Sequence, residues 1–436
     1  MTGRRSVPVP RTRIGRLARL GSLGAGLAGG MAAEGARSLA RGERPRLPGM
    51  ALTPGNAARL ARELATMRGA AMKVGQLLSM EAGDLLAPEL AEILGRLRET
   101  ADTMPPRQLK EVLSAEWGGD FLRRFRSFET TPIAAASIGQ VHRAETRDGR
   151  VLAIKVQYPG VAQAIDSDIR NLAGLMRWSG AVPKGLDMGP LLEAARVQLH
   201  EEADYRREAA ALARFGGLLA EDPEFAVPAV AEEFSTRRIL AMDFLPGEPV
   251  EALAREAAEV RDRVAAALIR LVLRETFELG LMQTDPNFAN YRYDPGTGRI
   301  VLLDFGAVQE IAPARAAQLR ELLRAALADD GGAIRESFAP LGLTDAATPP
   351  HHVGTMVEMA RMASAPLRQA GAFDFGASDL VARLRAKGME IGLAGDFATV
   401  PPVDVLLLQR KVAGTYLLVA RLGARVELSV LMAPYA

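Results

Sequence analysis

The stretch MQTDPNFANYRYDPGTGRIVLLDFG, residues 282–306, holds three side chains whose types and spacing suit phosphoryl transfer. That chemistry needs an aspartate beside the attacking group, an asparagine for one magnesium ion and a second aspartate before Phe-Gly for another. Asp285 and Asn290 have the spacing D-x-x-x-x-N, and Asp304 precedes Phe-Gly. A hairpin pattern separates Asn290 from Asp304, so we expect all three at one rim of a sheet. Asp285 is a predicted catalytic group, and Asn290 and Asp304 are predicted metal ligands.

A lysine upstream could hold the phosphates of the nucleotide. Lys155, in the strand-like run LAIK, is the expected partner of the α and β phosphates, and it needs a helix carboxylate to hold its ammonium. Glu208, in the amphipathic stretch DYRREAAALARF, is the first candidate, and Glu201 and Glu202 are its rivals. Together with the downstream aspartates, this pair predicts an enzyme that binds ATP with Mg²⁺.

The elements that must position these residues can be read from periodicity and turn signals. Apolar residues recur at helical spacing over 54–100 and again over 159–219. Between them, short β-branched runs flank Asp148-Gly149, which predicts an antiparallel hairpin. We therefore predict four segments: a basic, Gly/Ala-rich arm over 1–50, a helical extension over 51–120, a smaller lobe with inserted helices over 121–247, and a helical lobe over 248–436.

Composition excludes several other functions. The 436 residues contain 54 lysines and arginines against 52 aspartates and glutamates, so no overall field favours nucleic acid. The chain has no cysteine, which excludes disulfides, thiolate catalysis and cysteine zinc sites. Its oligomeric state stays open at this stage.

The arm is rich in arginine and leads into a glycine-rich run over 20–33. A membrane-spanning helix needs about 20 mostly apolar residues, and this run is shorter, so we expect no transmembrane helix. A secretory signal would also combine basic and apolar stretches, but the downstream nucleotide chemistry requires cytoplasmic ATP. We expect a cytoplasmic protein whose arm is either disordered or bound to anionic lipid at the inner face of a membrane.

The region after Asp304 differs from that of a protein kinase. The sequence between Gly306 and Pro313 holds no Ser, Thr or Tyr, a helix is expected to begin at Pro313, and no Ala-Pro-Glu follows. Protein kinases use a long activation segment here. We therefore do not expect a protein substrate docked in the usual way.

Several further motifs resemble the UbiB (AarF) family of atypical kinase-like proteins, over about residues 64–436. The matching stretches are MKVGQLLS, AAASIGQVH, EADYRREA, QTDPNFAN and DFG. The residues that the resemblance adds to the nucleotide site are Lys73, Gln76, Ala134, Ala135, Ala136, Ser137, Glu202 and Asp204.

The resemblance implies an α+β, two-lobed protein-kinase-like fold with a helical N-terminal extension, a mostly helical C-lobe and ATP and Mg²⁺ bound between the lobes. Alanine restricts the backbone where glycine would adapt to phosphates, so the alanine-rich loop should disfavour ordinary transfer to a protein. The family is linked with ubiquinone biosynthesis, which implies ATP hydrolysis or phosphorylation of a small or lipid-like acceptor, with quinone-pathway lipids or enzymes as partners. Two alternatives stay open: a nucleotide-dependent scaffold without useful turnover, and a small-molecule phosphotransferase unrelated to quinones.

Overall fold

The computed structural model describes residues 103–179, 189–394 and 401–435 of the chain. They fall into two compact units. Unit 1 runs to Ala213 and includes Ala229–Phe244, and unit 2 comprises Arg214–Pro228 and the residues from Leu245 onward. Both helices and strands contribute, which confirms the predicted α+β class. The arm over 1–50 and the helices expected over 54–100 lie outside the described residues.

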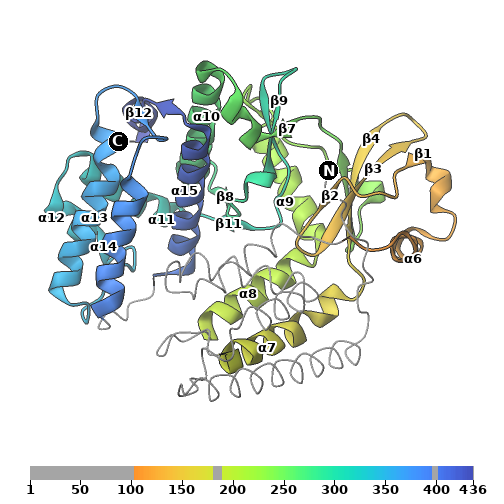
Figure 1. The fold of residues 1–436 in the computed structure, drawn as a ribbon, viewed down its shortest axis with the longest axis horizontal. Coiled ribbons are helices and arrows are strands. Elements are labelled where there is room, and N and C mark those ends of the chain that lie inside the picture. The colour runs from red at the N-terminus through yellow and green to blue at the C-terminus, as the bar shows by residue number, and fades with distance from the viewer. Residues whose placement is uncertain (1–102, 180–188, 395–400, 436) are drawn as a thin grey trace, which may run out of the picture. The chain divides into compact units, whose positions relative to one another are not determined.

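Unit 1 is built on a five-stranded antiparallel sheet with the order β1-β3-β4-β6, in which β2 pairs with β3 (Figure 1). Its strands are β1 (Phe125–Phe128), β2 (Ala134–Ala135), β3 (Gly139–Thr146), β4 (Val151–Gln157) and β6 (Ile239–Asp243). Its helices are α6 (Pro106–Trp117), α7 (Val161–Ser179), α8 (Gly189–Glu202) and the first part of α9 (Tyr205–Leu218), with short 3-10 turns at Phe121–Arg124 and Glu232–Phe234.

The predicted hairpin around Asp148-Gly149 is β3 and β4. Gly149 has a φ of 88°, a left-handed conformation that glycine adopts without strain. The amide of Thr146 donates to the carbonyl of Arg150 at 2.9 Å and closes the turn. Because β4 lies between β3 and β6, its apolar side chains from Leu152 to Val156 are buried.

The helical pattern over 159–219 forms three helices, α7, α8 and α9. The helical geometry is interrupted between Glu202, where α8 ends, and Tyr205, where α9 begins. This interruption separates the three glutamates that compete for Lys155, because Glu202 closes α8 while Glu208 lies in the first turn of α9.

Unit 2 combines small sheets with helices. Its strands are β5 (Phe225–Ala226), β7 (Glu248–Pro249), β8 (Leu281–Gln283), β9 (Tyr291–Asp294), β10 (Arg299–Leu302), β11 (Val308–Glu310), β12 (Phe373–Asp374) and β13 (Arg425–Val426). Its helices are α10 (Ala258–Phe277), α11 (Pro313–Leu327), α12 (Gly331–Phe338), α13 (Pro350–Arg368), α14 (Leu380–Ala394), α15 (Val403–Leu422) and α16 (Leu428–Met432), with 3-10 turns at Val250–Arg255, Phe288–Asn290 and Ala433–Tyr435. The four helices α11 to α14 lie side by side (Figure 1).

The strands of unit 2 position the two loops that carry Asp285, Asn290 and Asp304. One sheet has the order β5-β10-β9-β7, and a separate two-stranded sheet pairs β8 with β11. Residues 284–290 connect β8 to β9, and residues 303–307 connect β10 to β11. Both connections therefore start or end on the β8–β11 pair. No helix among residues 103–179, 189–394 and 401–435 combines the length and apolar character needed to cross a bilayer.

Candidate active site

In unit 1, Lys155 and Glu208 form the predicted ion pair. Lys155 lies on the central strand β4, and its Nζ donates to both carboxylate oxygens of Glu208, at 2.7 and 2.9 Å. The side chains are 10% and 3% exposed. The ring of Tyr205 lies 5.2 Å from the same Nζ, a distance suited to a cation–π contact. The structure thus selects Glu208 over Glu201 and Glu202.

The two rival glutamates have other partners. Glu201 accepts from Arg207 at 2.9 Å, and the Oε2 of Glu202 accepts from the hydroxyl of Ser137 at 2.8 Å. The second bond ties the end of α8 to the tip of the alanine-rich loop. Asp204 accepts from the amide of Arg206 at 3.1 Å and so caps the start of α9.

The alanine-rich loop is anchored to the sheet. Ala134 and Ala135 form β2, and the amide of Ala136 donates to the carbonyl of Gly139 at 2.9 Å. Ile138, at the turn, is 1% exposed and belongs to the core of unit 1. A loop with a buried isoleucine and paired backbone has little freedom to fold over phosphates.

Packing explains the single glycine of this loop. A Cβ at Gly139 would lie 2.5 Å from the carbonyl oxygen of Val156 and 2.7 Å from the hydroxyl of Tyr205. Both distances are shorter than real Cβ contacts, so only glycine fits here. Gly139 is therefore required by the approach of β3 to β4 and α9.

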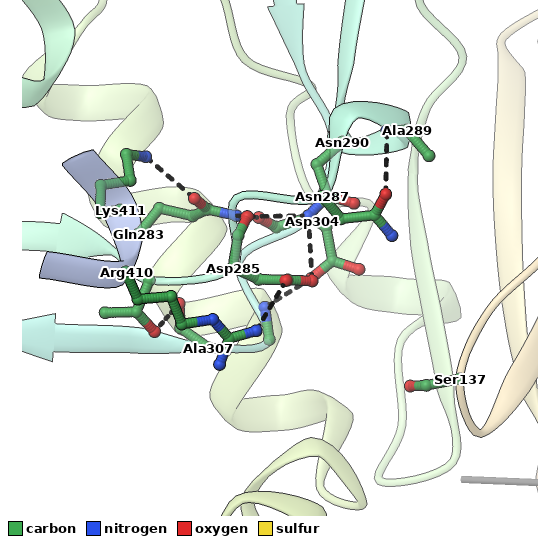
Figure 2. A network of polar contacts seen from close by, with 12 residues as sticks. Ser137, Gln283, Asp285, Asn287, Ala289, Asn290, Asp304, Ala307, Arg410 and Lys411 are labelled. Atoms are coloured by element: carbon green, nitrogen blue, oxygen red, sulfur yellow. Dashed lines mark hydrogen bonds and ion pairs between the residues drawn. The ribbon is translucent and has the colours of Figure 1, made fainter. Parts of the chain in front are cut away.

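In unit 2, the three predicted side chains lie together (Figure 2). The amide nitrogen of Asn290 donates to the backbone carbonyl and to the Oδ2 of Asp285, both at 3.3 Å. Asp304 lies in the turn after β10, where its Oδ1 accepts from the amide of Gly306 at 2.9 Å. The amide of Leu303 donates to the carbonyl of Asn290 at 3.0 Å, which joins the two loops.

Gln283 links both loops, and its role was missed from the sequence. Its amide nitrogen donates to the backbone carbonyls of Asp285 at 2.7 Å and Asp304 at 3.3 Å. Its amide oxygen accepts from Lys411 at 3.0 Å and from the hydroxyl of Tyr291 at 3.3 Å. One buried side chain thus fixes the backbone under both carboxylates.

Two basic residues of α15 were also missed. The Nη2 of Arg410 lies 3.2 Å from the Oδ1 of Asp285. Lys411 pairs with Glu275 at 3.1 Å, both side chains being 1% exposed, and donates to the Tyr291 hydroxyl at 3.1 Å. Burial lowers the pKa of Lys411, but the attraction of Glu275 and Tyr291 outweighs burial and raises the pKa above its ordinary value. The available signal was the basic pair Arg410-Lys411 inside the mostly apolar stretch VDVLLLQRKVAGTYLLVARL.

The donor set of unit 2 fits a hard divalent cation. Mg²⁺ prefers oxygen ligands and is usually bound through one or two carboxylates together with substrate phosphates. Asp304 offers a carboxylate. Asn290 offers its side-chain oxygen, because its side-chain nitrogen donates to Asp285. Within the described part of the chain, no three His, Cys, Asp or Glu side chains form a metal cluster by themselves.

Lys73 and Gln76, the remaining predicted site residues, lie outside the described residues. Each unit therefore brings its own predicted set together: Lys155 with Glu208 in unit 1, and Asp285 with Asn290 in unit 2.

Comparison with known proteins gives consistent matches. The sequence profile described as "ABC1 atypical kinase-like domain" matches residues 96–338. The atypical kinase COQ8B, mitochondrial, of Rattus norvegicus is 38% identical over 420 residues, covering 96% of this chain and 79% of the rat protein. The atypical kinase COQ8, mitochondrial, of Saccharomyces cerevisiae is 38% identical over 428 residues, covering 97% of this chain and 84% of the yeast protein.

One solved structure also resembles this one over most of its length. The complex of Rv3197 with erythromycin from Mycobacterium tuberculosis superposes with a TM-score of 0.59 at 26% sequence identity. The match covers 86% of this chain and 94% of that chain. Together with the profile match, it confirms the predicted kinase-like fold.

Proposed function

The chain belongs to the ABC1 atypical kinase-like family, as its UbiB resemblance predicted, and is an enzyme of phosphoryl transfer; from this premise we propose that it binds ATP with Mg²⁺ and transfers the γ-phosphoryl group to water or to a small or lipid-like acceptor. The observation that carries the proposal is the joining of Asp285, Asn290 and Asp304 through the Asn290 amide and Gln283. These are the three side chains that phosphoryl transfer on a kinase scaffold requires.

In the proposed mechanism, each residue has a separate role. Lys155, held by Glu208, binds the α and β phosphates of ATP. Asn290 and Asp304 would hold Mg²⁺, which when bound neutralises charge on the phosphate oxygens. Asp285 orients the attacking oxygen. Its carboxylate can do so because Asn290 holds Oδ2 and Arg410 holds Oδ1.

The segment after Asp304 supports a small acceptor. Residues 307–312 comprise the three residues of β11 and three further residues, and α11 begins at Pro313. None of these six positions is a Ser, Thr or Tyr that could receive a controlling phosphate. An acceptor that needs no extended docking segment, such as water or the head group of a lipid, fits this connection better than a peptide.

The anchored alanine-rich loop supports the same choice. Ala134–Ala136 and Ser137 are proposed to face the nucleotide, and Ser137 is restrained by Glu202 at 2.8 Å. A restrained loop offers one fixed cradle, whereas transfer to varied protein substrates benefits from an adaptable one. We further propose that Lys73 and Gln76 reach the phosphates.

The pathway and location are part of the proposal. The family resemblance supports a role in ubiquinone biosynthesis, with quinone-pathway lipids or enzymes as partners. The two relatives described above are named as mitochondrial proteins. For this chain we propose peripheral association with an anionic membrane through the arginine-rich arm over 1–50.

Phosphate release from ATP and Mg²⁺ tests the proposal directly. The native chain is compared with Asp304→Asn, and Asp294→Asn serves as the matched control, because Asp294 ends β9 and accepts hydrogen bonds from the β9–β10 turn, where asparagine is equally suitable. We expect Asp304→Asn to abolish release, Asp294→Asn to retain it, and anionic vesicles to increase it in the native chain. Nucleotide binding with no release by the native protein, in the presence of vesicles and a panel of small hydroxyl acceptors, would favour the scaffold alternative.

A further inference from the structure

Helix α15 packs directly on the loop that carries Asp285. Three of its residues, Arg410, Lys411 and Gly414, lie within two turns of the helix and all face residues 283–291. A Cβ on Gly414 would lie 2.2 Å from the Cβ of Pro286, the residue after Asp285. The helix backbone therefore touches the loop with no room for a side chain between them.

Arg410 completes the hydrogen bonding of the Asp285 carboxylate (Figure 2). Its Nη2 lies 3.2 Å from Oδ1, while the Asn290 amide donates to Oδ2 at 3.3 Å. With each oxygen held from a different element, the carboxylate plane cannot rotate freely. The Asp285 side chain is nevertheless 20% exposed, so one edge of it can still meet an acceptor.

Arg410 itself is deeply buried. Its side chain is 5% exposed, and within residues 103–179, 189–394 and 401–435 its Nε has no hydrogen-bond partner. Burying a charged group with an unsatisfied donor is unfavourable for folding. The contact of Arg410 with Asp285 is therefore made at a cost in folding free energy.

The loop has no cation of its own. The residues between Asp285 and Asn290 are Pro, Asn, Phe and Ala. We propose that Arg410 is a positioning residue that supplies, from a helix 125 residues downstream, the cation that orients Asp285 toward the phosphoryl acceptor. This inference rests on the proposed function, because Asp285 must act on an acceptor for its orientation to matter.

The expected kinetic signature follows from this role. Orientation of the attacking group counts in the transition state, and a displacement of about 1 Å can reduce the rate by roughly 100-fold. Loss of such an interaction lowers kcat and kcat/KM together and leaves KM for ATP unchanged. A merely structural role would instead lower the melting temperature and leave kcat per folded molecule unchanged.

Steady-state phosphate release by Arg410→Gln and Arg410→Lys separates the two roles. We expect Arg410→Gln to lower kcat by about 10- to 100-fold with KM for ATP unchanged. Arg410→Lys should recover most of the loss because it keeps the cation. The matched control is Arg421→Gln, on the same helix but 64% exposed and 3.8 Å from Glu251, which should leave both parameters unchanged.

A second measurement keeps the inference testable if the native chain shows no turnover. Hydrogen exchange of the amides over 284–291 should accelerate in Arg410→Gln and stay at the native rate in Arg410→Lys and Arg421→Gln. Native turnover with unchanged kcat in Arg410→Gln would overturn the inference and leave the proposed function standing. Without native turnover, unchanged exchange in Arg410→Gln would overturn it, and accelerated exchange would establish that Arg410 orders the loop.

Discussion

Each unit contains a buried lysine that pairs with a glutamate beside a tyrosine ring, and the two pairs differ in enclosure. In unit 1, Lys155 bonds both oxygens of Glu208 and lies 5.2 Å from the ring of Tyr205. In unit 2, Lys411 pairs with Glu275 at 3.1 Å and lies 5.7 Å from the ring of Tyr291. The Lys155 side chain is 10% exposed, whereas that of Lys411 is 1% exposed.

The exposure of the lysine distinguishes the two pairs: the Lys155–Glu208 pair can contact a ligand, whereas the Lys411–Glu275 pair stabilises the fold. The ammonium of Lys411 has three oxygen neighbours: it forms an ion pair with Glu275 and donates hydrogen bonds to Gln283 and Tyr291. That arrangement fixes α15 against the loops of unit 2, and at 1% exposure the Lys411 side chain is closed to a phosphate. Lys155 retains some access to solvent, which a phosphate-binding lysine needs.

The largest expected effect is on stability, in Lys411→Met. Removing one partner of a fully buried ion pair leaves the other charge uncompensated and costs about 3–5 kcal/mol of unfolding free energy. Adding Glu275→Gln should recover most of this loss of unfolding free energy. The second substitution removes the uncompensated charge and keeps a side-chain oxygen that accepts from the backbone amide of Gln283. Urea unfolding followed by circular dichroism measures both variants.

Lys387→Met, which removes a partly exposed lysine of α14, is the control for the Lys411 experiment and should change the urea midpoint little. A double variant that is no more stable than Lys411→Met would show that packing, and not the charge pair, holds α15.

Acid should lower the unfolding free energy of unit 1 through protonation of His142. Burial lowers the pKa of His142 from 6.5 to about 4, while the hydrogen bond to the Glu129 carbonyl opposes this. Between pH 6.5 and 4, His142 therefore binds more protons in the unfolded chain than in the folded one. Its contribution to the unfolding free energy is complete above pH 6.5 and is lost as pH falls toward 4. The loss amounts to about 3 kcal/mol at pH 4.

Both tryptophans, at positions 117 and 178, belong to unit 1, so tryptophan emission during urea unfolding at several pH values reports the acid effect. His142→Gln should reduce the pH dependence of the urea midpoint. His200→Gln, which removes an exposed histidine of α8, should leave it unchanged. A midpoint independent of pH in the native chain would mean that His142 is not buried as a neutral ring.

The smallest stability effect is expected for Lys155→Met. Because this pair is less enclosed than that of unit 2, we expect a loss of about 1–3 kcal/mol of unfolding free energy. Phosphate release should fall much more, by about 100-fold, because in the proposed mechanism Lys155 holds the nucleotide phosphates. Thermal melting and phosphate release measure the two effects, with Arg126→Met, 62% exposed on β1, as the control. A stability loss equal to that of Lys411→Met would break the contrast between the two pairs.

Local signals in the sequence predicted a large part of the site. Asp148-Gly149 predicted the β3–β4 hairpin that carries Lys155, since turn chemistry acts over a few residues. The order Asp285, Asn290, hairpin, Asp304 predicted their common location, because a hairpin returns the chain to its starting edge. The pairing of Lys155 with Glu208 was also predicted, although the break between α8 and α9 that excludes Glu202 was not.

The sequence by itself determined which residues could do chemistry and which short elements hold them, because spacing and turn signals act locally along the chain. Only the tertiary structure decided what surrounds Asp285. Arg410 and Lys411 lie 125 and 128 residues from Asp285 and Gln283, and no local signal states that α15 crosses that loop. The close contact of Gly414 with Pro286 and the buried charges of α15 determine that packing, and such long-range contacts depend on the whole folded unit.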